Sequence, residues 1–263
     1  MIDEHQLMEN LGKFRDMRQL ERDYLLTLLL HEISSKFANE LIFKGGTALK
    51  YFYNLNRFSE DLDFSYMPDR NPTDVKALAK TIESVILNLG RQYQVVSSEH
   101  RTRKEGNKTI GLNYMIRVRG PLNPRSSQLQ NINIDLSLRN DILLKSELKY
   151  ISPIYQDIGT FSLQVMNIEE ILAEKVSAVL ERSKMRDIYD VYYLLVIKKI
   201  NYDEKLIKEK VGKRNEKFDK KTLKKKIETA RDKMKWRSEL AYTVNPLPEN
   251  GEVIKQLTEL MNL

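Results

Sequence analysis

Near residue 165 the spacing of apolar residues changes, and this change constrains the possible folds more than any other feature of the sequence. Before it, short runs alternate between apolar and polar residues, which predicts half-buried strands. The strand-like runs cover residues 41–43, 62–66, 92–97, 112–119 and 131–138. Helices are expected over residues 17–38 and 73–89, the second with Thr73 as its N-cap.

After residue 165 the apolar residues recur with helical spacing to the end of the sequence. Helices are expected over residues 168–182, 187–198, 203–211, 218–236 and 251–261. The charged segment 102–109 is expected to be a mobile hairpin loop. The patterns therefore predict an α/β (α+β) protein, with a mixed sheet and flanking helices in residues 1–165 and an all-α lobe in residues 166–263.

The composition excludes several kinds of site. The chain of 263 residues contains no cysteine, so it has no disulfide, thiolate nucleophile or cysteine zinc site. Its three histidines are scattered and show no paired metal-ligand spacing. The longest apolar run is far too short to span a bilayer, and the acidic start is unlike a signal peptide. We expect a soluble cytoplasmic protein with no membrane partner.

The net charge of +7 is concentrated in one segment. Residues 211–237 contain twelve Lys or Arg and four acidic residues, so this segment carries +8 and the rest of the chain about −1. Such a basic stretch is expected of a protein that binds a phosphate-rich partner. A lysine-rich helix face exposed to solvent is the alternative interpretation.

The segment from Lys44 to Tyr66 carries the clearest chemical signal. Asp61 and Asp63 are two residues apart on an expected strand, so both carboxylates project from one face. Such a pair suits Mg²⁺, which takes one or two carboxylates and leaves positions for water and phosphate. Gly45-Gly46-Thr47 lies upstream between a strand and a helix, where backbone N–H groups can approach a phosphate.

A third carboxylate is expected from the strand over 131–138. Its isoleucines and leucines alternate with Asn133, Asp135 and Ser137, so the polar side chains share one face. If this strand lies beside the Asp61 strand, three acids converge on one surface. The alternative is the polar outer face of a half-buried sheet.

The second half of the chain has ionisable residues on apolar helix faces. Asn167 and Glu170 have the spacing of a capping box, and Lys175 lies in the middle of the apolar stripe of the helix that follows. A buried lysine is costly unless its ammonium finds an anion or extends out to solvent. In the functional interpretation, Lys175 reaches a phosphate or a catalytic carboxylate across the lobe interface. Asp187 could cap the next helix, but Asp190 is a full turn inside it.

Four segments together resemble the AbiEii/AbiGii toxin family of bacterial abortive-infection and toxin–antitoxin systems, within the nucleotidyltransferase superfamily that includes DNA polymerase β and the minimal nucleotidyltransferases. They are K-G-G-T-A-L (44–49), R-F-S-E-D-L-D-F (57–64), E-K-V-S-A-V-L-E-R (174–182) and R-D-I-Y-D-V-Y (186–192). The resemblance implies transfer of a nucleoside monophosphate from an NTP with release of pyrophosphate. The 3′ end of tRNA is the acceptor in some members.

The resemblance also implies roles for particular residues. Asp61, Asp63 and Asp135 would bind Mg²⁺ (or Mn²⁺) and, with Lys175 and Asp190, would be catalytic. The residues expected to bind the nucleotide are Lys44, Gly45, Gly46, Thr47, Arg57, Ser59, Lys175 and Asp187. A cognate antitoxin is a further expected partner.

Other functions remain open at this stage. The basic stretch also fits a non-catalytic RNA-binding module, and the acceptor could be a protein side chain instead of RNA. A P-loop enzyme or protein kinase is excluded, because the sequence has neither G-x-x-x-x-G-K-[ST] nor H-R-D.

Overall fold

The structure is a computed structural model that describes the whole chain except residues 1, 38, 68–73, 123–128 and 215–216. The chain divides into two compact units. Unit 1 comprises Met1–Thr47, Glu60–Asn140 and Glu147–Val165, and unit 2 comprises Ala48–Ser59, Asp141–Ser146 and Met166–Leu263.

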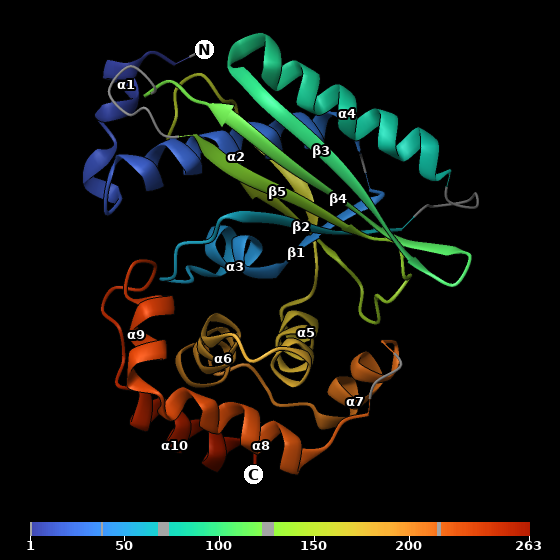
Figure 1. The fold of residues 1–263 in the computed structure, drawn as a ribbon, viewed down its shortest axis with the longest axis vertical. Helices are drawn as coiled ribbons and strands as arrows, with labels where there is room; N and C mark the ends of the chain where they lie inside the picture. The colour runs from blue at the N-terminus through green and yellow to red at the C-terminus, as the bar shows by residue number, and fades with distance from the viewer. Residues whose placement is uncertain (1, 38, 68–73, 123–128, 215–216) are drawn as a thin grey trace. The chain divides into compact units, whose positions relative to one another are not determined.

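Unit 1 is built on one seven-stranded sheet (Figure 1). Its strands are β1 (Leu41–Lys44), β2 (Asp61–Tyr66), β3 (Gln94–Glu105), β4 (Lys108–Arg119), β5 (Gln130–Ser137), β6 (Glu147–Ile151) and β7 (Phe161–Val165). Their order across the sheet is β3-β4-β5-β2-β1-β7-β6. The β2–β5 and β1–β7 pairs are parallel and the other pairs are antiparallel, so the sheet is mixed as the sequence predicts.

Two long helices of unit 1, α2 (Met17–Lys36) and α4 (Val75–Gln92), pack against one face of this sheet. That face carries the apolar residues of the alternating strands, such as Ile132 and Ile134, which are fully buried. The cap of α4 differs from the prediction. Thr73 lies outside the described residues, and the cap is Asp74, whose carboxylate accepts hydrogen bonds from the N–H groups of Lys76 and Ala77. A short helix, α1 (Glu4–Met8), precedes α2.

Segment 102–109 was expected to be a mobile hairpin loop; the hairpin is present, but most of the segment is strand and not loop. β3 and β4 continue through it as an antiparallel hairpin that pairs Thr102 with Leu112 and Glu105 with Lys108. The turn consists only of Gly106, which has a φ of +59°, and Asn107. β3 is an edge strand and its outer half is exposed, so no apolar alternation marks it. β6 and β7 were not expected either.

Unit 2 is helical. It contains α5 (Ile168–Glu181), α6 (Met185–Tyr192), a π-helical turn (Tyr193–Ile197), α7 (Glu204–Gly212), α8 (Lys220–Glu228), α9 (Lys233–Leu240) and α10 (Asn250–Leu260). The single helix expected over 218–236 is instead α8 and α9. α8 ends at Glu228, a 3-10 turn covers Thr229–Arg231, and the side chain of Asp232 caps α9. One of the boundaries between the units falls within α3 (Gly45–Tyr53).

A buried ionic cluster joins three segments of unit 2. Asn167 caps α5, but Glu170 does not complete the expected capping box. Its carboxylate accepts hydrogen bonds from the N–H groups of Leu143 and Leu144 and pairs at 2.6 Å with Lys210, which is fully buried. Glu170 therefore ties segment 141–146 and α7 to α5.

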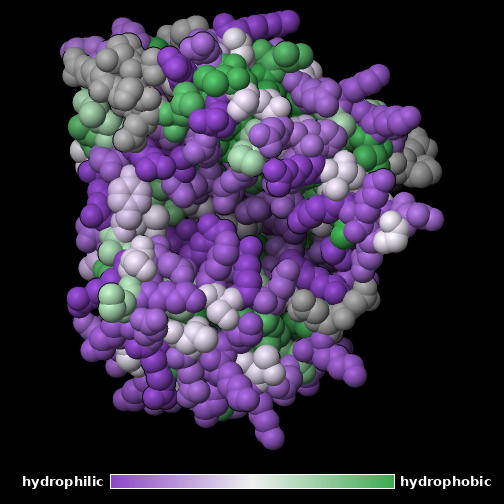
Figure 2. All heavy atoms as spheres, in the orientation of Figure 1, coloured by the Kyte–Doolittle hydropathy of each residue, from purple (hydrophilic) through white to green (hydrophobic). Residues whose placement is uncertain are grey.

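The face drawn in Figure 2 is mostly hydrophilic, with apolar residues only in scattered patches. Among the described residues, no helix has both the length and the apolar character needed to cross a membrane.

Candidate active site

Two of the expected carboxylates lie side by side on the polar face of the unit 1 sheet. β2 and β5 are parallel neighbours, and their register places Asp63 opposite Asp135 and Asp61 opposite Asn133. Asp61 accepts a hydrogen bond from Asn133 Nδ2 at 2.9 Å, so β5 also orients this carboxylate. Asp61, Asp63 and Asp135 thus occupy one patch of two adjacent strands.

Gly45 makes room for Asp63 at the start of α3. Its φ of +75° is strained for any residue with a side chain. A Cβ at position 45 would also lie 3.0 Å from Cβ and Cγ of Asp63 and closer still to Oδ2. Glycine is therefore required here for the Asp63 carboxylate to stand against the first turn of the helix.

Lys44, Gly46 and Thr47 surround this turn. The Thr47 side chain is fully buried, and its hydroxyl donates a hydrogen bond to the backbone carbonyl of Asp61. This bond fixes the start of β2 against α3. Lys44 lies opposite Asp63 in the β1–β2 pairing and is 7% exposed.

Asp135 has a partner that the sequence did not reveal. Arg103 of β3 donates a hydrogen bond to Asp135 Oδ1 at 2.5 Å. Burial raises the pKa of Asp135, and the charges of Arg103 and Lys44 oppose this shift. The sequence could not identify Arg103, because its segment was interpreted as a loop.

The donor set suits a hard cation even though the ligands are not assembled around one. Carboxylate oxygens are the ligands that Mg²⁺ prefers, and Asp61, Asp63 and Asp135 supply them on one surface. Within the described ranges, no three His, Cys, Asp or Glu side chains are grouped closely enough to hold a metal ion as they stand.

Unit 2 carries a second polar cluster, built around Asp190 of α6. Arg57 donates to both carboxylate oxygens of Asp190, with Nε and Nη2 each at 2.8 Å. Lys175 of α5 contacts the same carboxylate at 2.7 Å. Asp190 is fully buried and Arg57 is 5% exposed. The lysine that the sequence places in an apolar stripe has therefore found a buried anion within its own unit.

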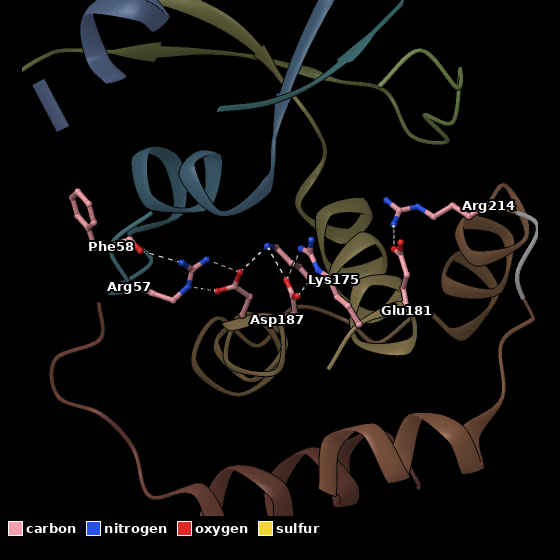
Figure 3. Close-up of polar contacts among 8 residues, drawn as sticks. Arg57, Phe58, Lys175, Glu181, Asp187 and Arg214 are labelled. Atoms are coloured by element: carbon pink, nitrogen blue, oxygen red, sulfur yellow. Dashed lines mark hydrogen bonds and ion pairs between the residues drawn. The ribbon is translucent and has the colours of Figure 1, made fainter. Parts of the chain in front are cut away.

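Asp187 belongs to this cluster and does not cap α6. Its buried carboxylate pairs with Arg182 at 2.9 Å and with Lys175 at 3.7 Å, whereas Lys184 is the N-cap residue. Figure 3 shows Arg57, Lys175 and Asp187 pointing toward one another, with the Glu181–Arg214 pair on another side of α5. Arg182 was not anticipated as a partner.

In this cluster the attraction between opposite charges outweighs the effect of burial on the pKa values of Asp190 and Arg57. Burial alone would raise the pKa of Asp190, but Arg57 and Lys175 hold that pKa at about 2. Burial would lower the pKa of Arg57, yet the same pair with Asp190 raises it above its ordinary value. Both groups are therefore charged at neutral pH.

Ser59 and the basic stretch 211–237 lie outside these two clusters. Ser59 is buried in unit 2, 7% exposed. Several residues of the basic stretch are engaged inside unit 2: Lys220 pairs with Glu204 at 2.8 Å, and Lys224 donates to the carbonyl of Leu263. Lys217, Lys221, Lys225 and Lys233 are exposed.

Solved structures of known proteins share this fold. The nucleotidyltransferase toxin MenT4 from Mycobacterium tuberculosis matches with a TM-score of 0.62 at 19% identity, covering 100% of this chain and 91% of MenT4. JHP933 from Helicobacter pylori matches with a TM-score of 0.54 at 20% identity, over 94% of this chain and 91% of that protein. A putative nucleotidyltransferase from H. pylori matches equally well, at 19% identity and 94% coverage of both chains. The predicted fold class is confirmed.

The family is shown by the sequence itself. No curated protein matches the chain. Residues 27–256, however, match the family described as "Nucleotidyl transferase AbiEii toxin, Type IV TA system". This match spans both units and includes every residue of the two clusters described above. The chain belongs to the AbiEii nucleotidyltransferase toxin family and is a nucleotidyltransferase of the toxin–antitoxin type.

Proposed function

We propose that this protein transfers a nucleoside monophosphate from an NTP to RNA in a Mg²⁺-dependent reaction, with the 3′ end of tRNA as the acceptor. The observation that carries the proposal is the β2–β5 register, which puts Asp63 opposite Asp135 with Asp61 on the same face. The Gly45 turn stands directly against this group. Carboxylates beside a helix start suit a metal-bound triphosphate.

Asp61, Asp63 and Asp135 are the proposed metal ligands. When bound, Mg²⁺ or Mn²⁺ would neutralise charge on the phosphates in the in-line displacement. Asp135 would also accept the proton of the attacking hydroxyl. The acceptor oxygen bonds to the α-phosphorus, the bond from that phosphorus to the bridging oxygen breaks, and pyrophosphate leaves with the electron pair.

The residues proposed to bind the nucleotide begin with those at the start of α3. The backbone N–H groups of Gly45, Gly46 and Thr47 would hold phosphate oxygens at the start of α3, next to Lys44. In unit 2, Lys175 would offset the negative charge of the triphosphate. The remaining nucleotide-binding residues proposed are Arg57, Ser59 and Asp187, and Asp190 is proposed as catalytic through its hold on Lys175.

The experiment that tests this function is incubation of the protein with each α-labelled NTP, Mg²⁺ and total bacterial RNA. The expected product is labelled RNA of tRNA size. It should not form when EDTA removes the metal. Label on a protein instead would favour a protein acceptor. RNA binding with no consumption of nucleotide would contradict the proposal and favour the non-catalytic RNA-binding module.

Replacing Lys175 by methionine is expected to reduce transfer by at least about a hundredfold, because the positive charge proposed to act on the triphosphate is lost. The variant should also be less stable, because Asp187 and Asp190 each lose a contact with Lys175 inside a buried cluster. We would measure initial rates at a temperature at which a melting curve shows the variant folded. Lys205→Met, at an exposed position of α7, is the matched control and should keep the wild-type rate. Full activity of Lys175→Met would remove this residue from the site.

The basic stretch 211–237 is the proposed contact for the RNA acceptor. Changing its exposed residues Lys217, Lys221, Lys225 and Lys233 to glutamine should raise the KM for RNA and flatten its dependence on salt, because fewer counterions are released. The KM for the NTP should change little. The same change at four exposed basic residues elsewhere, Lys36, Lys76, Lys80 and Arg91, is the charge-matched control. An equal salt slope in both variants would mean that these lysines are only a solvated surface.

The toxin family implies an antitoxin as a partner, and we propose that the protein acts in the cytoplasm. The absence of cysteine is compatible with that reducing compartment.

A further inference from the structure

Arg103 reaches the carboxylate patch from the far side of the hairpin. It lies on the edge strand β3, two strands away from β5, and pairs in register with Gly111 of β4. The ladder is irregular between Arg103 and Lys104. Irregularities of this kind bend a strand and redirect a side chain, and they are frequent next to active sites.

Gly111 leaves the space through which the Arg103 side chain passes. A Cβ at position 111 would lie 2.5 Å from Nη2 and 2.8 Å from Nε of Arg103, and 2.9 Å from the carbonyl oxygen of Leu136. The guanidinium thus lies directly over the backbone of β4, where any other residue would block it. Its far end meets Asp135 Oδ1 at 2.5 Å.

This contact occupies one oxygen of a proposed metal ligand. Asp135 lies opposite Asp63, so a cation held by both would bind at the carboxylate that now accepts a hydrogen bond from Arg103 through Oδ1. A guanidinium does not lose its proton at neutral pH. A divalent cation that binds the same oxygen would therefore have to displace the guanidinium, and the Arg103 side chain, 49% exposed, has room to move.

We propose that Arg103 is a positioning residue that holds Asp135 in the metal-free enzyme and is displaced when a divalent cation binds. Arg103 therefore competes with the cation for Asp135 and weakens metal binding in the absence of nucleotide. The inference rests on the proposed function in one respect, namely that Asp135 is a metal ligand.

Mn²⁺ binding in the absence of nucleotide, measured by electron paramagnetic resonance, tests this role directly. Arg103→Gln should bind Mn²⁺ about tenfold more tightly than wild type, because a charge-assisted contact no longer competes for Asp135. Arg101→Gln is the matched control. It removes the same charge from the same strand and face, two residues away, at a side chain that is 71% exposed and paired with Glu99. Its Mn²⁺ affinity should stay within about twofold of wild type, since surface charges are screened.

Gly111→Ala provides a second variant that changes no charge. The added methyl group would lie 2.5 Å from Arg103 Nη2 and 2.9 Å from the carbonyl oxygen of Leu136. Because the flexible arginine yields more easily than the backbone, the guanidinium is displaced and Mn²⁺ binding should again tighten. Gly159→Ala, where a Cβ meets no atom within 4 Å, controls for the substitution itself. Melting curves verify that each variant is folded.

The outcomes separate the two proposals. Equal or weaker Mn²⁺ binding by Arg103→Gln overturns the role of Arg103 alone and leaves its contact with Asp135 as a structural tie. If Asp135→Asn binds Mn²⁺ as tightly as wild type, then Asp135 is not a ligand, and the proposed metal site fails together with this inference.

Discussion

Replacing Asp61 or Asp63 by asparagine is expected to reduce nucleotide transfer at least about a thousandfold. Each substitution removes a negative charge from the proposed metal site while keeping the size of the side chain, so the loss falls on the electrostatic stabilisation of the transferred phosphate. The fit of position 63 against Gly45 is preserved as well. The measurement is single-turnover transfer from α-labelled NTP at saturating Mg²⁺.

The same substitutions should leave the melting temperature unchanged or raise it. Carboxylates on one face repel each other, and removing one relieves that repulsion. Ser65→Ala, on the same face of β2 two residues after Asp63, is the matched control and should retain activity. A wild-type rate for Asp61→Asn would show that the chemistry proposed for this patch is wrong. Lost activity with a lost fold would be a stability effect, which circular dichroism identifies.

Local pattern was sufficient to predict the chemical face of the sheet. Alternation along β2 and β5 places Asp61, Asp63 and Asp135 on the polar face, because side chains alternate strictly along a strand. That the two strands are neighbours could not be read from the sequence, because their pairing joins residues about 72 positions apart, as in the contact of Asn133 with Asp61. From the sequence, the three carboxylates could be predicted to lie together only on the condition that the two strands pair.

Buried ionisable residues were informative in a different way. Lys175 and Asp190 break the apolar faces of their helices, which shows that each needs a partner of opposite charge. The sequence does not say which partner. Arg57 is 133 residues from Asp190, and its Nε and Nη2 both donate to that carboxylate, a pairing that the sequence did not reveal.

Arg103 was missed because exposed edge strands carry no apolar alternation. A strand can be predicted from alternating apolar and polar residues only when one of its faces is buried. The outer half of β3 is exposed on both faces, so it lacks this alternation. The role of Gly111 could not be predicted either. In a sequence, a glycine that leaves space for a neighbouring side chain looks the same as a glycine in a turn.

Asp190→Asn is expected to lower the free energy of unfolding by about 3–5 kcal/mol, the cost of breaking a buried ion pair from one side. The substitution leaves the guanidinium of Arg57, 5% exposed, without its counter-charge, and Lys175 loses its nearest anion. Urea unfolding at pH 7 measures this loss. Asp203→Asn is the control and should cost little, because asparagine caps α7 as well as aspartate does.

The dependence on pH gives the same prediction a second readout. Because the pKa of Asp190 is about 2 in the folded protein and 3.8 when unperturbed, the unfolded state binds the proton first as pH falls. The stability contributed by Asp190 is therefore fully present above about pH 4 and is lost as the pH falls toward 2. Wild-type protein should lose stability more steeply than Asp190→Asn across this window, since asparagine does not titrate. Parallel curves would mean that Asp190 is not held ionised by Arg57 and Lys175, and the large loss expected at pH 7 should then be absent too.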